Sequence, residues 1–267
     1  MWPLRKKAIM SLTILFFATL SFAQEFDRIS GLYNERKYEQ VIEEANVLFK
    51  SGSEPSIEIL SLLGRAYVDI GKPKEAFPHL GKVIENKDKV PKWMEAWSLY
   101  YLSKAFARIG EMDSATQYLQ KTIETKATKN VVQAAKMDFV NLGLSPIFEK
   151  WHIKETTNFK FYFPKNTNVK DIDAFAKDRQ EAFDSINTFF NAKLPKRIHF
   201  YVWNKTVDYD RRNRRKSGFV IPELSIIHTR YFQTRGHEMT HVISFYSIDS
   251  KERTSFVNEG IATYFDL

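Results

Sequence analysis

Two histidines and a glutamate near the end of this 267-residue chain are spaced for metal chemistry. His237 and His241 stand four positions apart in the string His-Glu-Met-Thr-His, so on a helix both imidazoles lie on one face. Two such nitrogens can reach one zinc ion at ~2.0–2.1 Å without distorting the backbone. Glu238 projects roughly a quarter-turn away. Its position predicts a general base that acts on a water at the metal, not a ligand.

A third ligand is expected from a second helix. Glu259 follows His241 by 18 positions, within the string Asn-Glu-Gly-Ile-Ala, and can supply a carboxylate. Gly260 is expected to mark the point where the two helices touch, because it lacks a side chain. The set predicts a Zn²⁺ site that keeps an open position for water, whose pKa the ion lowers to ~7.

These two strings resemble the gluzincin branch of the zinc metallopeptidases, the peptidase MA-like superfamily of thermolysin and the aminopeptidases. The resemblance covers about residues 150–267, and the Asn-Glu-Gly-x-Ala run is closer to the aminopeptidase-like members. It implies that His237, His241 and Glu259 bind Zn²⁺ and that Glu238 is the general base. The implied activity is hydrolysis of peptide bonds in a peptide or protein substrate.

Two departures from the aminopeptidase pattern bear on specificity. Those members carry Gly-x-Met-Glu-Asn on an edge strand, where the Glu holds the free amine of the substrate. Here the corresponding stretch, 218–222, reads Gly-Phe-Val-Ile-Pro, which favours endopeptidase action. Such enzymes also place a Tyr or His beyond the third ligand to stabilise the oxyanion. Only eight residues follow Glu259, so that group is expected from elsewhere in the fold or from a longer chain.

Hydrophobic periodicity predicts an α+β domain over 146–267 around this site. Alternating apolar residues predict strands at 159–163 and 198–202, and an amphipathic helix between them runs from Ile172 to Phe190. Two apolar runs, at 218–221 and 224–228, predict strands or a hairpin. One of these is expected to form the sheet edge that faces the metal and receives an extended peptide. The two site helices are expected over 234–246 and 254–266.

Residues 24–145 are predicted to form a helical repeat domain, so that the chain combines helical and mixed α/β parts. Arg36, Gly71 and Gly110 are expected to occupy equivalent turns, 35 and 39 positions apart. The pattern resembles the tetratricopeptide repeat, in which a Gly ends the first helix of each pair. It implies a concave surface able to hold a protein partner. A helical hairpin array without a binding role is the alternative. A helix over 131–140 closes the array, and 141–146 marks the domain boundary.

The first 23 residues are typical of a secretory signal peptide. Arg5-Lys6-Lys7 precede an apolar run over 8–20, and Ala23 lies at the expected cleavage point. Cleavage there predicts an exported, periplasmic or extracellular protein without stable membrane insertion. An uncleaved anchor is the alternative, although the run is short for a span of ~20 residues. The chain has no Cys, which excludes disulfides.

Charge argues against nucleic acid as a partner. The formal net charge is +8, and removal of the three basic residues at 5–7 leaves 8 − 3 = +5, a modest surplus. The densest basic run, 211–216, could bind acidic substrates or anionic lipid, but a solvated loop is the favoured interpretation. His199 and His228 fall in predicted strands and are interpreted as structural. Asp266 is expected on the surface, with a supporting role beside Glu259 as the alternative.

Two other functions compete with the peptidase. The first is a repeat-based interaction module whose zincin-like domain is inactive. The second is a purely structural metal site, which is disfavoured because such sites usually have four protein ligands, often including Cys.

Overall fold

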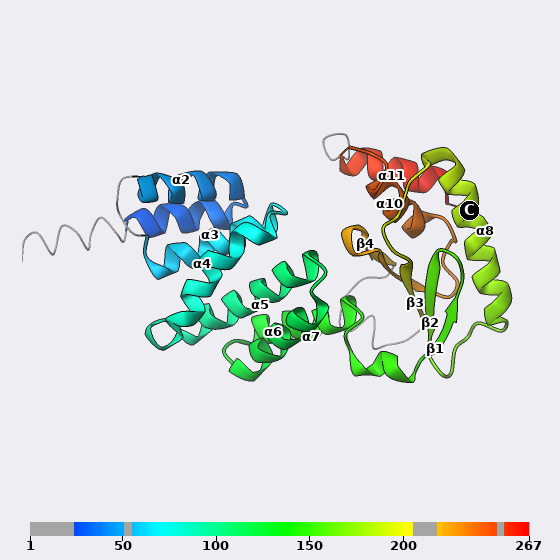
Figure 1. Cartoon of the computed structure of the whole chain (residues 1–267), viewed down its shortest axis with the longest axis horizontal. Helices are drawn as coiled ribbons and strands as arrows, with labels where there is room; N and C mark the ends of the chain where they lie inside the picture. The colour runs from blue at the N-terminus through cyan, green and yellow to red at the C-terminus, as the bar shows by residue number, and fades with distance from the viewer. Residues whose placement is uncertain (1–23, 51–54, 205–217, 250–253, 267) are drawn as a thin grey trace, which may run out of the picture. The chain divides into compact units, whose positions relative to one another are not determined.

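The computed structural model describes residues 24–50, 55–204, 218–249 and 254–266 (Figure 1). The predicted signal peptide and the basic run at 211–216 lie outside these ranges. The chain divides into two compact units, 1–136 and 137–267. The predicted boundary at 141–146 lies a few residues after this division. The combination of a helical part and an α+β part confirms the predicted class.

The first unit is built of helices joined by short turns. Residues 24–34 are helical, and each helix from α2 to α5 packs against its successor, whereas α7 crosses the division between the two units. The helices are α2 (Tyr38–Lys50), α3 (Ile57–Asp69), α4 (Pro73–Glu85), α5 (Lys92–Arg108), α6 (Met112–Thr125) and α7 (Lys129–Asn141), with a short 3-10 helix η1 (Lys87–Lys89) before α5. Fully buried Val41, Ala45 and Leu63 belong to the core that joins α2 to α3. An added Cβ at Gly64 would lie 2.6 Å from the Leu80 side chain, so α3 and α4 pack closely there.

Three turns of this unit share one backbone geometry. Arg36, Gly71 and Gly110 have φ values of 61°, 78° and 87°, the left-handed region. After each, the next amide donates to the carbonyl five positions earlier, as in Lys72 N to Tyr67 O at 2.9 Å. This pairing is the Schellman ending of a helix, in which glycine avoids the steric penalty of positive φ. The spacing of 35 and 39 residues therefore identified equivalent turns.

The second unit contains a five-stranded mixed sheet in the order β1-β2-β3-β5-β4. Strands β2, β3 and β5 are parallel, whereas β1 and β4 lie antiparallel at the two edges. The strands are β1 (His152–Glu155), β2 (Phe159–Phe163), β3 (Ile198–Trp203), β4 (Phe219–Ile221) and β5 (Ile226–Arg230); a 3-10 turn, η3 (Pro222–Leu224), joins β4 to β5. The prediction that one of the two apolar runs forms a sheet edge is confirmed by β4.

One face of the sheet is covered by helices. Alternating Phe159, Phe161 and Phe163 on β2 are fully buried there, together with Phe200. Against them pack α8 (Ile172–Phe190) and α10 (His237–Phe245); the last helix, α11 (Ser255–Tyr264), packs on α10. This core fixes α10 beside the antiparallel edge of the sheet.

The opposite face carries stacked rings from four strands. Tyr162, Tyr201, His228 and Phe219 follow one another from β2 to β4, with centroids 4.4, 4.6 and 4.7 Å apart and planes within 10° of parallel. A second layer closes over them, in which Phe148 of η2 (Pro146–Lys150) lies 4.6 Å from the Tyr201 ring. The sheet is thus buried on both faces, which explains the near-continuous apolar and aromatic character of β3.

Two details differ from the sequence prediction. Strand β1 was not anticipated, because three of its four residues are exposed and its pattern carries no buried face. Helix α10 begins at His237, three residues after the predicted start. Residues 234–236 are not helical and follow a turn in which the amide of Arg230 donates to the Gln233 side chain at 2.6 Å.

Candidate metal centre

Helix α10 presents its two histidines because its other face is anchored in the core. Met239, Val242 and Ile243 are fully buried against the sheet. His237 and His241 lie on the remaining face, with ring centroids 5.1 Å apart. The arrangement follows from the i, i+4 spacing on a helix whose apolar stripe is fixed.

Helix α11 brings Glu259 to the two imidazoles. One carboxylate oxygen lies 3.6 Å from His237 Nε2, and the other lies 3.7 Å from His241 Nε2. One ligand atom from each of the three residues falls within 4.8 Å of the others. In the described part of the chain this is the group of histidines and carboxylates that could hold a metal ion. Three residues selected by sequence spacing therefore converge on one point.

The separations fit a transition-metal ion. In a tetrahedral site with bonds of ~2.1 Å, neighbouring ligand atoms lie ~3.4 Å apart. The two distances between imidazole nitrogen and carboxylate oxygen, 3.6 and 3.7 Å, are near that value. A small side-chain rotation would bring the atoms to it. Two imidazoles and one carboxylate form a donor set that zinc accepts at catalytic sites, where a fourth position stays open.

Burial favours the ligand form of the His241 imidazole. Burial is the main cause that lowers the pKa of His241, while Glu259 opposes the shift and His237 adds to it. A metal ligand must be the neutral imidazole, which a lowered pKa favours. Side-chain exposure rises from 13% at His241 and 26% at His237 to 66% at Glu259. The group therefore opens to solvent on the side of α11.

Glu238 lies outside this three-residue group and beside the edge strand. An added Cβ at Gly218, the residue before β4, would lie 2.7 Å from Glu238 Oε1 and 2.7 Å from the carbonyl oxygen of His228. The carboxylate of Glu238 therefore rests against the backbone at the start of β4. Only a glycine leaves room for that approach. Glu238 is not one of the three converging residues, and its role as a general base stays a prediction.

The expected contact at Gly260 is wrong. An added Cβ there would meet nothing within 4 Å, so the helices do not touch at that residue. Close approach occurs instead at Gly236, where an added Cβ would lie 1.8 Å from the carbonyl oxygen of Phe265. Phe265, the residue that follows α11, thus packs directly on Gly236, the residue that precedes α10. The sequence pattern suggested a glycine at the junction but placed it on the wrong helix.

The strand histidines are structural, as interpreted from the sequence. His228 is fully buried; its Nδ1 accepts from Trp203 Nε1 at 3.0 Å and its Nε2 lies 3.0 Å from the carbonyl of Asn141. Burial lowers the pKa of His228 to about 3, so the ring stays neutral. His199 contacts the Tyr162 hydroxyl at 3.0 Å, and burial lowers its pKa to about 4. Asp266 is exposed, the favoured interpretation.

An ion pair that was not predicted from the sequence fixes the residues just before α10 to α8. Arg235 donates to Asp178 of α8 at 2.7 Å, two residues before His237. The neighbouring Arg179 donates to the carbonyl of Gln233 at 3.2 Å. Both contacts link α8 to the turn that leads into α10. No local pattern reveals them, because the paired residues are 57 and 54 positions apart.

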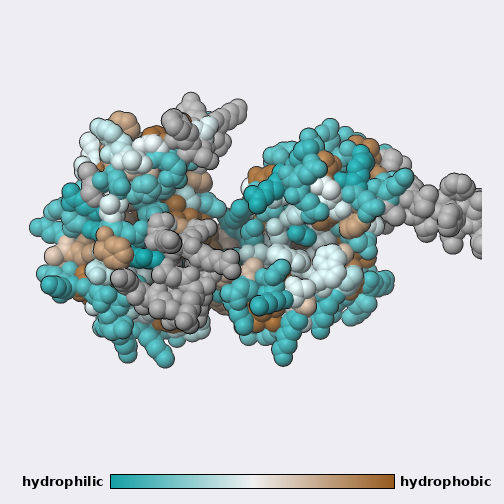
Figure 2. Space-filling model, turned by 180° about the vertical axis from the view of Figure 1, so that it is seen from behind, coloured by the Kyte–Doolittle hydropathy of each residue, from teal (hydrophilic) through white to brown (hydrophobic). Residues whose placement is uncertain are grey.

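Comparison of the chain with protein-family models, with curated proteins and with solved structures found no match in any of the three. Among the described residues no helix is long and apolar enough to cross a membrane. Figure 2 shows that the visible faces of the described residues are mainly hydrophilic, with apolar residues in small patches.

Proposed function

We propose that this chain is a zinc-dependent endopeptidase of the gluzincin type. The observation that carries the proposal is the convergence of His237, His241 and Glu259 within 4.8 Å, from two helices, with an opening to solvent. A zinc ion held there would supply a Lewis acid and a water whose pKa is lowered to ~7. The resemblance of the strings that contain His237 and Glu259 to the gluzincin family supports a zincin-type domain over 146–267.

The residues of the chain divide the chemical work between them. The two imidazoles and the Glu259 carboxylate hold the ion and leave one side free for the carbonyl of the substrate. Glu238 is placed to accept a proton from the attacking water on its carboxylate and to pass it to the leaving amine. General acid–base assistance of this kind contributes typically ~10²–10⁴-fold.

Strand β4 offers the place for the substrate backbone. Among the described residues it is an antiparallel edge strand paired only with β5, and the Glu238 carboxylate lies at Gly218, the residue before it. An extended peptide can add to such an edge through main-chain hydrogen bonds, which align its carbonyl groups with the metal site. The fourth position of 218–222 is Ile221, where the aminopeptidase pattern has a Glu. Recognition of a free amine is therefore not part of the proposal.

The helical unit supports a second part of the proposal. Its equivalent turns and closely packed helix pairs favour a tetratricopeptide-like array over 24–145 that holds a protein partner. The N-terminal pattern at 1–23 supports export, with cleavage near Gln24. N-terminal sequencing of the exported form tests that point, and recovery of soluble protein that retains Met1 would contradict it.

The experiment compares wild type with Glu238→Gln in hydrolysis of denatured protein substrates, with zinc content measured in both. Hydrolysis should fall at least ~10²-fold while zinc stays bound, because the amide keeps the size of the side chain but cannot accept the proton. Glu181→Gln, on an exposed position of α8 with 63% side-chain exposure, is the matched control and should match wild type. Equal activity in wild type and Glu238→Gln rejects the assigned base.

Metal binding is tested on its own. The double variant His237→Ala, His241→Ala should lose stoichiometric zinc, since one carboxylate cannot hold the ion. His152→Ala, an exposed histidine on β1, should keep it. Zinc that survives the double substitution places the site elsewhere. A wild type that binds zinc but hydrolyses no substrate favours the alternative, an inactive zincin-like domain on an interaction scaffold.

A further inference from the structure

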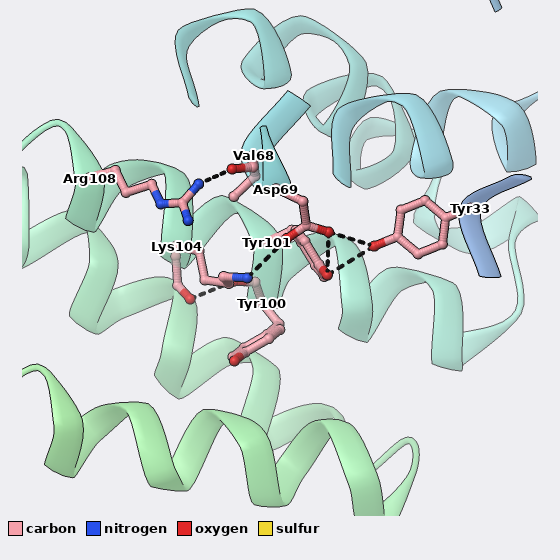
Figure 3. Close-up of polar contacts among 8 residues, drawn as sticks. Tyr33, Val68, Asp69, Tyr100, Tyr101, Lys104 and Arg108 are labelled. Carbon is pink, nitrogen blue, oxygen red and sulfur yellow. Dashed lines mark hydrogen bonds and ion pairs between the residues drawn. The ribbon is translucent and has the colours of Figure 1, made fainter. Parts of the chain in front are cut away.

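The helical unit contains a polar network centred on Asp69 of α3. Its Oδ2 accepts from the hydroxyls of Tyr33 at 2.9 Å and Tyr101 at 3.0 Å, and its Oδ1 accepts from Lys104 Nζ at 3.3 Å (Figure 3). The two hydroxyls also contact one another at 2.9 Å. Both carboxylate oxygens are therefore satisfied, and Lys104 of α5 is the counterion.

Arg65, one turn earlier on α3, takes no part in that ion pair. Its guanidinium carbon lies over three aromatic rings, 4.4 Å from the centroid of Tyr33, 5.1 Å from that of Tyr101 and 5.3 Å from that of Trp97. Its Nε is buried and has no hydrogen-bond partner. Within the described residues, Arg65 forms no ion pair. An unpaired buried donor is rare in folded proteins and calls for an explanation.

The aromatic cage orients this cation. Tyr33 and Tyr101 are buried and held by Asp69, so the rings cannot turn away without breaking the network. Arg65 and Trp97 remain partly exposed. A guanidinium fixed by stacking loses little rotamer entropy when it binds a ligand, which favours recognition by its planar fork.

The chemistry of the cage selects a carboxylate. A guanidinium pairs with a carboxylate through two parallel N–H···O bonds, and the two groups share one plane. Because the guanidinium is stacked on aromatic rings, a planar carboxylate that lies in the guanidinium plane matches it better than a tetrahedral phosphate does. Local charge does not oppose a carboxylate, because α3 and α5 together carry four basic residues (Arg65, Lys92, Lys104, Arg108) against three acidic ones (Glu58, Asp69, Glu95). Arg108 itself is turned to the carbonyl of Val68 (Figure 3).

We propose that Arg65 in its cage of Tyr33, Trp97 and Tyr101 is a binding site for a carboxylate group of a peptide partner. The carboxylate comes from an acidic side chain or from a peptide C-terminus. The site uses three helices that open successive helix pairs: 24–34, α3 and α5. It stands independently of the proposed peptidase, since all of its residues belong to the helical unit.

The test uses the full chain labelled with 5-fluorotryptophan, in which the ¹⁹F signal of Trp97 reports on the cage. Three peptides of otherwise identical neutral sequence serve as probes at millimolar concentration: one with a central Glu and an amidated end, one with Gln and a free C-terminal carboxylate, and one with Gln and an amidated end. At least one carboxylate peptide should shift the Trp97 signal in a saturable way, whereas the neutral peptide should not. The two carboxylate arms distinguish side chain from terminus.

Arg65→Gln should weaken that binding at least about tenfold, because the charged fork is removed. Arg65→Lys keeps a cation over the rings, so it controls for unfolding caused by loss of that charge. It should also bind more weakly, since an ammonium cannot pair through two parallel bonds. Arg28→Gln, an exposed arginine of the same unit that pairs with Glu44, is the matched control and should bind as wild type does. The proposal is overturned if no carboxylate peptide shifts the signal, if the neutral peptide binds equally, or if both Arg65 variants bind as tightly as wild type.

Discussion

Replacement of Gly236 by Ala should damage both the fold and the metal centre, whereas the same change at Gly260 should not. The added methyl group at Gly236 would lie 1.8 Å from the Phe265 carbonyl oxygen and 3.0 Å from its carbonyl carbon. Ordinary contact begins near 3.4 Å, so the end of α11 must move by about 3.4 − 1.8 = 1.6 Å. The obstacle is backbone, which cannot rotate aside as a side chain can.

The magnitude follows from that displacement. Overpacking of a well-packed site typically costs 1–3 kcal/mol, and a clash with backbone belongs at the upper end, about 3 kcal/mol. Phe265 follows Glu259 on the same helix and its extension, so the shift also moves the carboxylate away from His237. Zinc affinity should fall by a factor of roughly 10–100, the range seen when groups that orient metal ligands are disturbed. At Gly260 the Cβ position is open, and Ala in mid-helix should stabilise by about 0.5–1 kcal/mol.

Urea unfolding and zinc titration of Gly236→Ala, Gly260→Ala and wild type measure both effects. The expected order of stability is Gly260→Ala, wild type, Gly236→Ala. The opposite result would be a Gly236→Ala variant as stable as wild type and a Gly260→Ala variant impaired in zinc binding. It would show that the helices meet at Gly260 and would refute the packing described above.

Two further predictions concern the rest of each unit. For His228, the folded-state pKa of about 3 lies below the ordinary 6.5, so its stabilising effect is complete above pH 6.5 and is lost as pH falls towards 3. Between pH 7 and 5 this residue alone should lower the free energy of unfolding by about 2 kcal/mol, at 1.4 kcal/mol per unit; in urea unfolding, His228→Gln should show a smaller decrease, and an equal decrease would contradict the assignment. At the equivalent turns, Gly71→Ala should destabilise by about 1–2 kcal/mol and Arg36→Gly should stabilise by about 0.5–1 kcal/mol, as judged from thermal unfolding. Effects of the same sign would argue against equivalent turns.

Much of the second unit could be predicted because its signals are local. Phe159, Phe161 and Phe163 alternate on β2, and the apolar stripe of α8 repeats at helical spacing. A short stretch of sequence is therefore enough to predict which face of each element is buried. The equivalent turns of the first unit share that property, since a positive φ at Gly71 and Gly110 marks the end of each helix. In each case the residues that decide the structure lie within one element.

Other features depend on partners far away in the chain. The ring stack of Tyr162, Tyr201, His228 and Phe219 comes from four strands, and its register could not be inferred before the strand order was known. The cage of Arg65 likewise requires three helices. A lone arginine on α3 carries no signal of the aromatic rings that surround it.

The candidate site combines both kinds of information. His237 and His241 are placed by one helix, so their spacing sufficed. Glu259 reaches them only because α11 docks on α10, and that docking depends on contact between the Gly236 and Phe265 backbones. Since the proposed ligands come from two helices, an ion bound by all three would stabilise the docked arrangement by its own binding free energy. The proposal therefore couples metal binding to the packing of α11: a change that loosens the helix junction should weaken metal affinity, and zinc in turn should protect the junction against unfolding.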